Sequence, residues 1–185
     1  YETQGQLQLA EAHYQRAIRI QPAHVESLIG MARVKAAEQR HEQSRGYLSR
    51  ARAVNPGAPE IYAAEANLEL EQAFREQNPE RRGRAFDQAY RALLTAHQLA
   101  PEDVEIERLL IRIDLYRNRT GAAIERAEGI VRRFPNSPQL LYMLATVQRG
   151  SDLQSAVRRL EQALRLSPQE SLLRFSLEEV LLENA

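Results

Sequence analysis

Prolines recur along this chain at a nearly constant spacing. The separation is 34 residues from Pro22 to Pro56, 45 from Pro56 to Pro101, 34 from there to Pro135, and 33 on to Pro168. A period of this size indicates a structural repeat, in which stacked units bury together an apolar face that one unit cannot bury alone. Because proline cannot continue a helix and biases its predecessor away from the helical region, each one should end a helix and begin a turn.

The residues upstream of each proline repeat a size pattern. At twelve, eight and five residues before the proline the side chains are small, large and small, in the sets Ala10, Tyr14, Ala17; Ser44, Leu48, Ala51; Ala89, Leu93, Ala96; and Ala156, Leu160, Ala163. The set Ala123, Ala127, Ile130 exchanges the sizes. Spacings of four and three residues place each trio on one helical face, where small side chains let a neighbouring helix approach closely. Each set therefore predicts a packed helix.

These segments resemble the second helix and terminal proline of the tetratricopeptide-repeat family, as in AEAHYQRAIRIQP, SRGYLSRARAVNP and AVRRLEQALRLSP. The segments VESLIGMARVKAA, VEIERLLIRIDLY and PQLLYMLATVQRG match its first helices. The resemblance covers essentially the whole chain. It implies an all-α fold, a right-handed α-solenoid of stacked antiparallel helix hairpins whose first helices line a concave groove. The alternative is an unrelated helical bundle with coincidental prolines.

The repeats divide the chain as one array. We expect a partial repeat at 1–22, repeats at 23–56, 57–101, 102–135 and 136–168, and a terminal helix at 169–185. Tyr1 lies four residues before Gly5, where the resemblance places the end of a first helix. We therefore expect most of that helix to be missing and the chain to be a piece of a longer array.

The repeat at 57–101 is longer than its neighbours, and the sequence NPERRGRAF indicates how the extra residues are used. Asn78 is a good N-cap, Pro79 suits the first helical position, and Glu80 complements the helix dipole, so a helix should begin here. The added residues amount to about three helical turns shared between two helices. Both helices should then project past their neighbours as a spur, although Gly83 costs about 1 kcal/mol relative to alanine.

The balance of charge argues against a nucleic-acid partner. The 25 acidic residues balance the 25 basic ones, and small arginine clusters at 81–84, 132–133 and 158–159 have neighbouring acids, so we expect no nucleic-acid partner. No stretch approaches the roughly 20 apolar residues of a membrane span.

The absence of cysteine suits a bacterial cytoplasm and a periplasm equally, which leaves the localisation open. Lys35 is the only lysine, a bias typical of GC-rich bacterial genomes.

Sequence patterns of catalysis are missing from the chain. It contains no HExxH, GxSxG, GxxxxGK[ST] or GxGxxG. The histidines are scattered without a convincing metal spacing, at His13, His24, His41 and His97. We therefore expect no enzyme, no cofactor and no metal.

We expect a protein-interaction scaffold whose concave groove binds an extended peptide or a partner's helix. The resemblance points six side chains of first helices into that groove: Arg33, Asn67, Arg108, Arg112, Tyr142 and Arg149. Arginine and tyrosine are enriched at binding hot spots. Two alternatives stay open: a structural segment of a larger machine, preceding an enzyme or an outer-membrane export barrel, or a self-associating assembly module.

The last helix carries two apolar stripes at helical spacing. The stripe Leu173, Leu177 and Val180 should pack on the preceding helix. The other stripe consists of Leu172, Phe175 and Leu182 and is rotated too far for the same helix to cover it. An uncovered apolar face at the end of a solenoid favours association, so a homodimer through the C-terminal helix is possible.

Overall fold

A computed structural model describes residues 2–183, with side chains from residue 5 onward. Helices and turns account for all of the described residues, which confirms the all-α prediction. The helices are α1 (Glu2–Ile20), α2 (Val25–Ala37), α3 (His41–Val54), α4 (Pro59–Arg75), α5 (Pro79–Leu99), α6 (Val104–Tyr116), α7 (Thr120–Arg133), α8 (Pro138–Gln148), α9 (Leu153–Leu166) and α10 (Ser171–Glu183).

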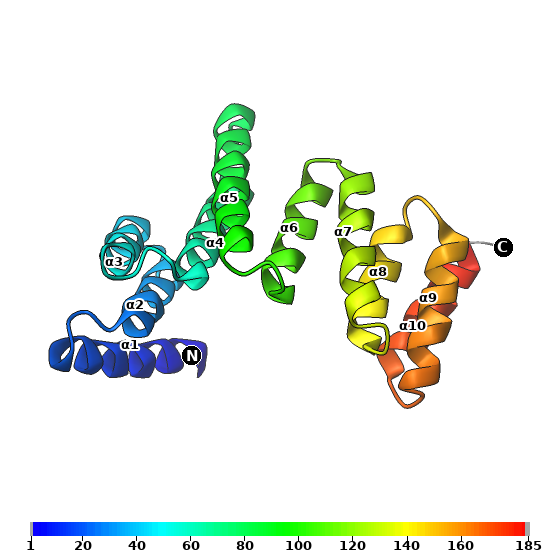
Figure 1. The fold of residues 1–185 in the computed structure, drawn as a ribbon, viewed down its shortest axis with the longest axis horizontal. Helices are drawn as coiled ribbons and strands as arrows, with labels where there is room; N and C mark the ends of the chain where they lie inside the picture. Colours follow the sequence, from blue (N-terminus) through cyan, green and yellow to red (C-terminus); the bar gives the residue numbers. More distant parts are fainter. Residues whose placement is uncertain (1, 184–185) are drawn as a thin grey trace. The chain divides into compact units, whose positions relative to one another are not determined.

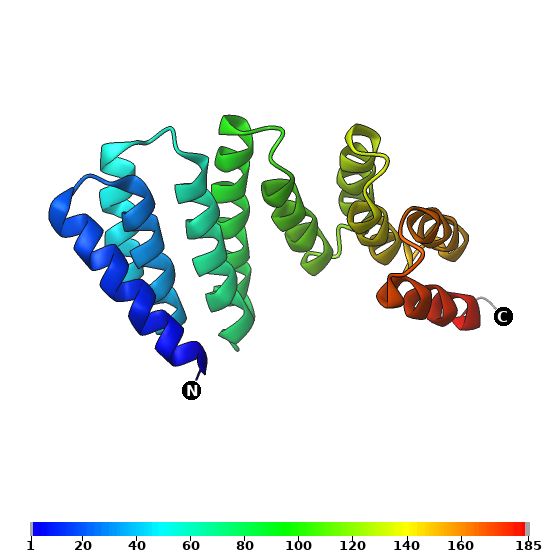
Figure 2. The same ribbon diagram turned by 90° about the horizontal axis from the view of Figure 1, so that it is seen from below.

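The chain forms two compact units, which we call unit 1 (Tyr1–Ile106) and unit 2 (Glu107–Ala185). Within each unit, helices that follow one another along the chain run antiparallel and are joined by tight turns (Figures 1 and 2). The prolines of the period lie in these turns, as predicted. The single array and its repeat boundaries remain a prediction.

The predicted small and large side chains form the packed faces of the second helices. Ser44, Leu48 and Ala51 of α3 are at most 1% exposed. The corresponding trios of α5, α7 and α9 are at most 2% exposed, namely Ala89, Leu93, Ala96; Ala123, Ala127, Ile130; and Ala156, Leu160, Ala163. The size pattern therefore identified the core positions of these helices.

Helix α1 packs against α2 through a close contact and an ion pair. A Cβ atom on Gly30 would lie only 2.3 Å from the ring of Tyr14, so glycine is what lets this tyrosine lie on α2. Lys35 is 4% exposed, and its Nζ lies 2.6 Å from Glu11 Oε1 and 2.9 Å from Glu38 Oε2. The only lysine of the chain thus joins α1 to α2.

The helix predicted to end at Gly5 does not end there. Helix α1 is continuous from Glu2 to Ile20 and passes through Gly5. Glycine in a helix interior costs only about 1 kcal/mol relative to alanine. The glutamine, leucine, alanine and glutamate residues that follow it are good helix formers, which together outweigh that cost.

The predicted lengthening of the two helices in the repeat at 57–101 is confirmed. Helices α4 and α5 have 17 and 21 residues, whereas α2 and α3 have 13 and 14. The side chain of Asn78 caps α5, because its Oδ1 accepts from the backbone N–H groups of Glu80 and Arg81, each at 3.0 Å. The rings of Phe74 and Phe86 meet edge to face, 5.8 Å between centroids. We call residues 74–86 the spur.

Unit 2 holds a buried ion-pair network between α6 and α7. Arg126 Nε donates to Asp114 Oδ2 at 3.0 Å, and Arg126 Nη1 lies 3.6 Å from Glu107 Oε2. Asp114 is 1% exposed and Glu107 is 8% exposed. Arg133 also reaches Glu107, at 3.7 Å. Arg126 thus contacts both buried carboxylates of α6, and Arg133 contacts one of them.

The terminal helix α10 packs on α9 by one of its two stripes. Leu173 and Val180 are buried and Leu177 is half-buried, as predicted. Phe175 is 60% exposed and Leu182 is 79% exposed. Among the helices that the structure describes, none has the length and apolar character that crossing a membrane requires.

Candidate functional site

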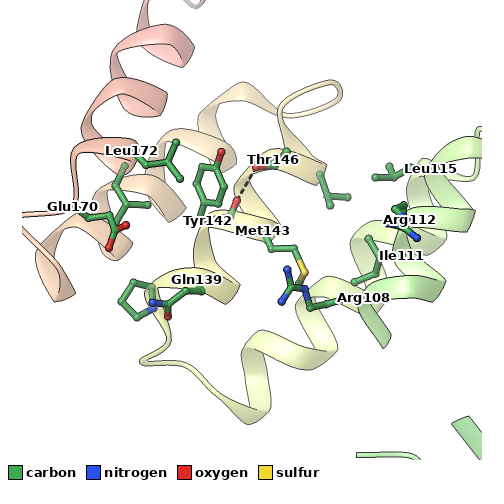
Figure 3. A pocket seen from close by; sticks show the side chains of 13 residues that line it. Arg108, Ile111, Arg112, Leu115, Gln139, Tyr142, Met143, Thr146, Glu170 and Leu172 are labelled. Carbon is green, nitrogen blue, oxygen red and sulfur yellow. Dashed lines mark hydrogen bonds between the residues drawn. The ribbon is translucent and has the colours of Figure 1, made fainter. Parts of the chain in front are cut away.

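An open cavity of about 480 Å³ lies within unit 2, between α6, α8 and the beginning of α10 (Figure 3). It is built by the first helices of two hairpins and by the terminal helix. The sequence analysis assigned α6 and α8 to the groove, whereas it assigned α10 to possible self-association.

The α6 wall of the cavity presents two arginines above an apolar base. Arg108, Ile111, Arg112 and Leu115 follow one another at spacings of three, one and three, which places them on one helical face. Ile111 is 3% exposed, whereas Arg108 and Arg112 are exposed. The guanidinium groups thus stand at the rim, and aliphatic carbon forms the wall below.

The α8 wall is mostly apolar. Tyr142, Met143, Thr146 and Val147 occupy two successive turns of one face. The hydroxyl group of Thr146 donates to the carbonyl oxygen of Tyr142 at 2.9 Å, the contact drawn in Figure 3. This hydrogen bond satisfies the threonine hydroxyl within its own helix, so it needs no ligand group.

The beginning of α10 and the turn before it form the third wall of the cavity, with one acidic residue and two leucines. Leu172 and Leu173 begin the helix, and Glu170 lies in the turn before it. The cavity therefore has an apolar centre, a positive edge on α6 and a negative group opposite it (Figure 3). Such a surface can hold an apolar side chain and can orient a charged segment that runs across it.

The structure distributes the six predicted groove residues over three places. Arg108, Arg112 and Tyr142 line the cavity of unit 2. Arg33 and Asn67 line a smaller groove of about 220 Å³ within unit 1, formed by α2, α3 and α4. The sixth, Arg149, lies at the end of α8 and does not line the cavity. A binding role remains a prediction for all six.

Arg149 is instead paired with carboxylates of α10. Its Nε donates to Glu183 Oε2 at 2.9 Å, and its Nη1 donates to Glu179 Oε2 at 3.2 Å. The bond to Glu183 raises the pKa of the arginine and holds the pKa of that carboxyl below its usual range. The guanidinium that was expected in the groove therefore holds the terminal helix against α8.

The sequence analysis missed most of the apolar lining. Ile111 and Met143 lie next to the predicted Arg112 and Tyr142, and Val147 lies four residues after Met143 on the same face, so helical spacing could have identified them. Leu172 was assigned to the self-association stripe, but it lines the cavity while remaining 52% exposed. It belongs to the candidate site as well.

One Ser–His–Glu arrangement occurs in unit 1, and its geometry is that of a helix cap. His24 Nδ1 lies 2.8 Å from Ser27 Oγ and accepts from the Ser27 backbone N–H at 3.2 Å, and Glu26 lies 3.5 Å from His24 Nε2. Ser27 is 4% exposed, so its hydroxyl is closed to a substrate. Within residues 2–183, no group of three histidine, aspartate or glutamate side chains could hold a metal ion.

Comparison with known proteins points to one repeat family. The model of the tetratricopeptide repeat matches residues 3–68. No curated protein in the comparison matches the chain.

Solved structures resemble the chain over nearly its whole length. TTC0263, a thermophilic tetratricopeptide-repeat protein of Thermus thermophilus, is 18% identical with a TM-score of 0.77, over 98% of this chain and 93% of that one. PilF of Pseudomonas aeruginosa is 19% identical with a TM-score of 0.71, over 100% and 81%. YrrB, described as a tetratricopeptide-repeat protein with an unusual peptide-binding site, is 12% identical with a TM-score of 0.62, over 95% and 85%. These likenesses show an all-α helical-repeat solenoid.

Proposed function

Because the chain is a tetratricopeptide-repeat protein, we propose that it is a protein-interaction scaffold and that the cavity of unit 2 holds a segment of its partner. The fold supports an interaction scaffold in general. The assignment of the cavity rests on one observation, the convergence of α6, α8 and α10 on an open apolar space with arginines at its rim.

The lining determines the chemistry of the segment. Met143, Val147 and Leu172 suit one or two apolar side chains of an extended peptide or a partner's helix. Arg108 and Arg112 suit carboxylates, because guanidinium groups form charge-assisted and often bidentate hydrogen bonds with them. The preferred partner segment therefore carries an apolar anchor next to acidic residues. Its binding should weaken as salt concentration rises, because exposed charge pairs are screened.

We expect the joint change Arg108→Ala and Arg112→Ala to weaken binding by about 1 to 3 kcal/mol, the loss typical of interface hot spots. A peptide-display selection against the intact protein supplies the ligand, and fluorescence anisotropy of the selected peptide measures its Kd. The selected sequences should combine acidic and apolar residues.

The matched control changes Arg158 and Arg159 of α9 to alanine. These residues carry the same charge and do not line the cavity. Their loss should leave Kd unchanged once net charge is allowed for by salt titration. Selected peptides that bind the cavity double variant as tightly as the unchanged protein would place the site elsewhere.

The exposed stripe of α10 favours self-association as a second role. Phe175 and Leu182 are apolar and more than half exposed, and a face of this kind is stabilised when another surface covers it. We expect concentration-dependent dimerisation in sedimentation velocity, weakened when both residues become serine. Leu172 is left unchanged in this variant because it also lines the cavity. A monomer throughout the micromolar range, with or without the two changes, would disprove the dimer.

A further inference from the structure

The spur carries a concentration of positive charge without ion-pair partners among the described residues. Arg75, Arg81, Arg82 and Arg84 are all exposed. Within residues 2–183, none of the four has an ion-pair or hydrogen-bond partner for its side chain. Arg81 and Arg84 are three positions apart on one helix, where like charges repel by about 0.2 to 0.5 kcal/mol. This surface therefore presents several guanidinium groups close together and exposed to a partner.

The nearby acids do not neutralise these arginines. Residues 75–84 contain four arginines and two glutamates. Glu76 is occupied in the turn, where its Oε1 accepts from the backbone N–H of Asn78 at 2.9 Å. Glu80 is exposed and follows the cap of α5. The region therefore keeps a net positive charge in a chain that is neutral overall.

Two other arginines of unit 1 are used differently. Arg45 reaches Glu42 at 2.8 Å and Glu69 at 3.0 Å, and thereby joins α3 to α4. Arg52 pairs with Glu65 between the same two helices. The arginines of the spur make no such contact between helices, so the ion pairing that stabilises unit 1 does not account for them.

The spur also presents an exposed aromatic side chain, and its helix α5 is longer than the counterpart α3. Phe74 is 48% exposed beside the ring of Phe86. Helix α5 is seven residues longer than α3, which corresponds to about 10 Å of additional helix. A partner can thus reach aromatic carbon and guanidinium groups together.

We propose that the spur is a second docking surface, separate from the cavity, for an acidic linear segment of a partner protein. Guanidinium forks match carboxylates in bidentate geometry, and Phe74 offers an apolar contact on the same spur. Glu76 and Glu80 stand among the arginines and would repel a continuous row of phosphates. A single exposed phenylalanine also provides no series of stacking positions for bases. Carboxylates spaced along a peptide can avoid both acids.

The test uses a fluorescein-labelled peptide in which glutamates alternate with glycines on both sides of one central phenylalanine. Anisotropy is measured with the intact protein carrying Arg108→Ala and Arg112→Ala, so that the cavity does not contribute. Changing Arg81, Arg82 and Arg84 together to glutamine should raise Kd about tenfold, because exposed pairs contribute about 0.2 to 1 kcal/mol each. The control variant changes Arg158, Arg159 and Arg165 of α9 to glutamine, removes the same charge and should leave Kd nearly unchanged.

Two outcomes would overturn the proposal. If the spur variant and the control variant raise Kd by the same factor, the peptide responds only to the net charge of the protein. A uridine oligonucleotide and vesicles containing phosphatidylserine are tested as competitors for the same arginines. If either binds more tightly than the peptide, the ligand of the spur is not an acidic protein segment. Circular dichroism should show an unchanged helix content in both variants, because all of the changed side chains of the spur are exposed.

Discussion

Replacing Arg126 by alanine should destabilise unit 2 by about 3 to 5 kcal/mol, the usual cost of removing one partner from a buried ion pair. Asp114 is 1% exposed and accepts a hydrogen bond from Arg126 through Oδ2, and its Oδ1 has no hydrogen-bond partner among the described residues. Without the guanidinium, the buried carboxylate of Asp114 loses its hydrogen bond to Arg126, and the buried carboxylate of Glu107 loses its contact with the same side chain. Urea unfolding followed by circular dichroism measures the loss.

Arg132→Ala is the matched control for this prediction. Arg132 lies on the same helix with a side chain 70% exposed and a single ion pair, 3.8 Å to Glu128, so its loss should cost less than about 0.5 kcal/mol. Hydrogen exchange should show the damage of Arg126→Ala first in α6 and α7. If that variant does not fold, Arg126→Lys keeps the charge and should lose part of the stability. A loss under 1 kcal/mol for Arg126→Ala would contradict the assigned network.

Lys35→Ala should destabilise unit 1 by about 2 to 3 kcal/mol. The cost is below that of a fully buried pair, because the side chains of Glu11 and Glu38 are 22% and 23% exposed and can recover some hydration. The control is Arg40→Ala, which removes another partner of Glu38 at 3.4 Å but from a side chain that is 56% exposed. Urea unfolding should show a loss under about 0.5 kcal/mol for the control. Equal losses for the two variants would contradict a special role of Lys35.

The stabilisation by Lys35 should depend on pH in a defined direction. The hydrogen bond from Lys35 lowers the pKa of Glu11. Burial lowers the pKa of Lys35, but its bonds to Glu11 and Glu38 outweigh burial and raise it. The contribution of Glu11 to folding stability is therefore fully present above about pH 4.3, the ordinary pKa of a glutamate. It is lost as the pH falls through the lower pKa that Glu11 has in the folded protein. The contribution of Lys35 is complete below about pH 10.4 and is lost as pH rises further. The unchanged protein should exceed Lys35→Ala in free energy of unfolding by the largest margin between these two pH values. The margin should shrink below the lower value and above the higher one.

The sequence predicted the helices and their packed faces because both depend on short spacings. Proline ends a helix through its own geometry, so Pro22 or Pro135 marks a turn without reference to any other residue. Leu48 and Leu93 could be assigned to the core from their positions on a helical face alone. The start of α5 at Asn78 followed in the same way from a local cap.

Contacts between helices were not predictable in this way. The pairing of Lys35 with Glu11 spans 24 residues and depends on how α1 and α2 are rotated against each other, which the period leaves undefined. The same holds for Arg126 and its acids, and for Arg149, whose partners on α10 replaced its expected place in the groove. The predicted helix end at Gly5 was wrong because the helix propensity of the residues that follow outweighs the cost of one glycine.

The shallow packing of α10 has a consequence for the affinity of the cavity. Helices α2 and α10 both have 13 residues, but α2 buries eight of them and α10 buries only Leu173, Ser176 and Val180. A helix held by so few residues opens at a lower free energy than the unit as a whole. Because this helix contributes Leu172 and Leu173 to the cavity, we expect the proposed partner segment to bind only molecules in which α10 is closed. The apparent Kd is then the intrinsic Kd divided by the closed fraction. Affinity can therefore be tuned at Arg149 or Val180, without changing any atom that touches the ligand.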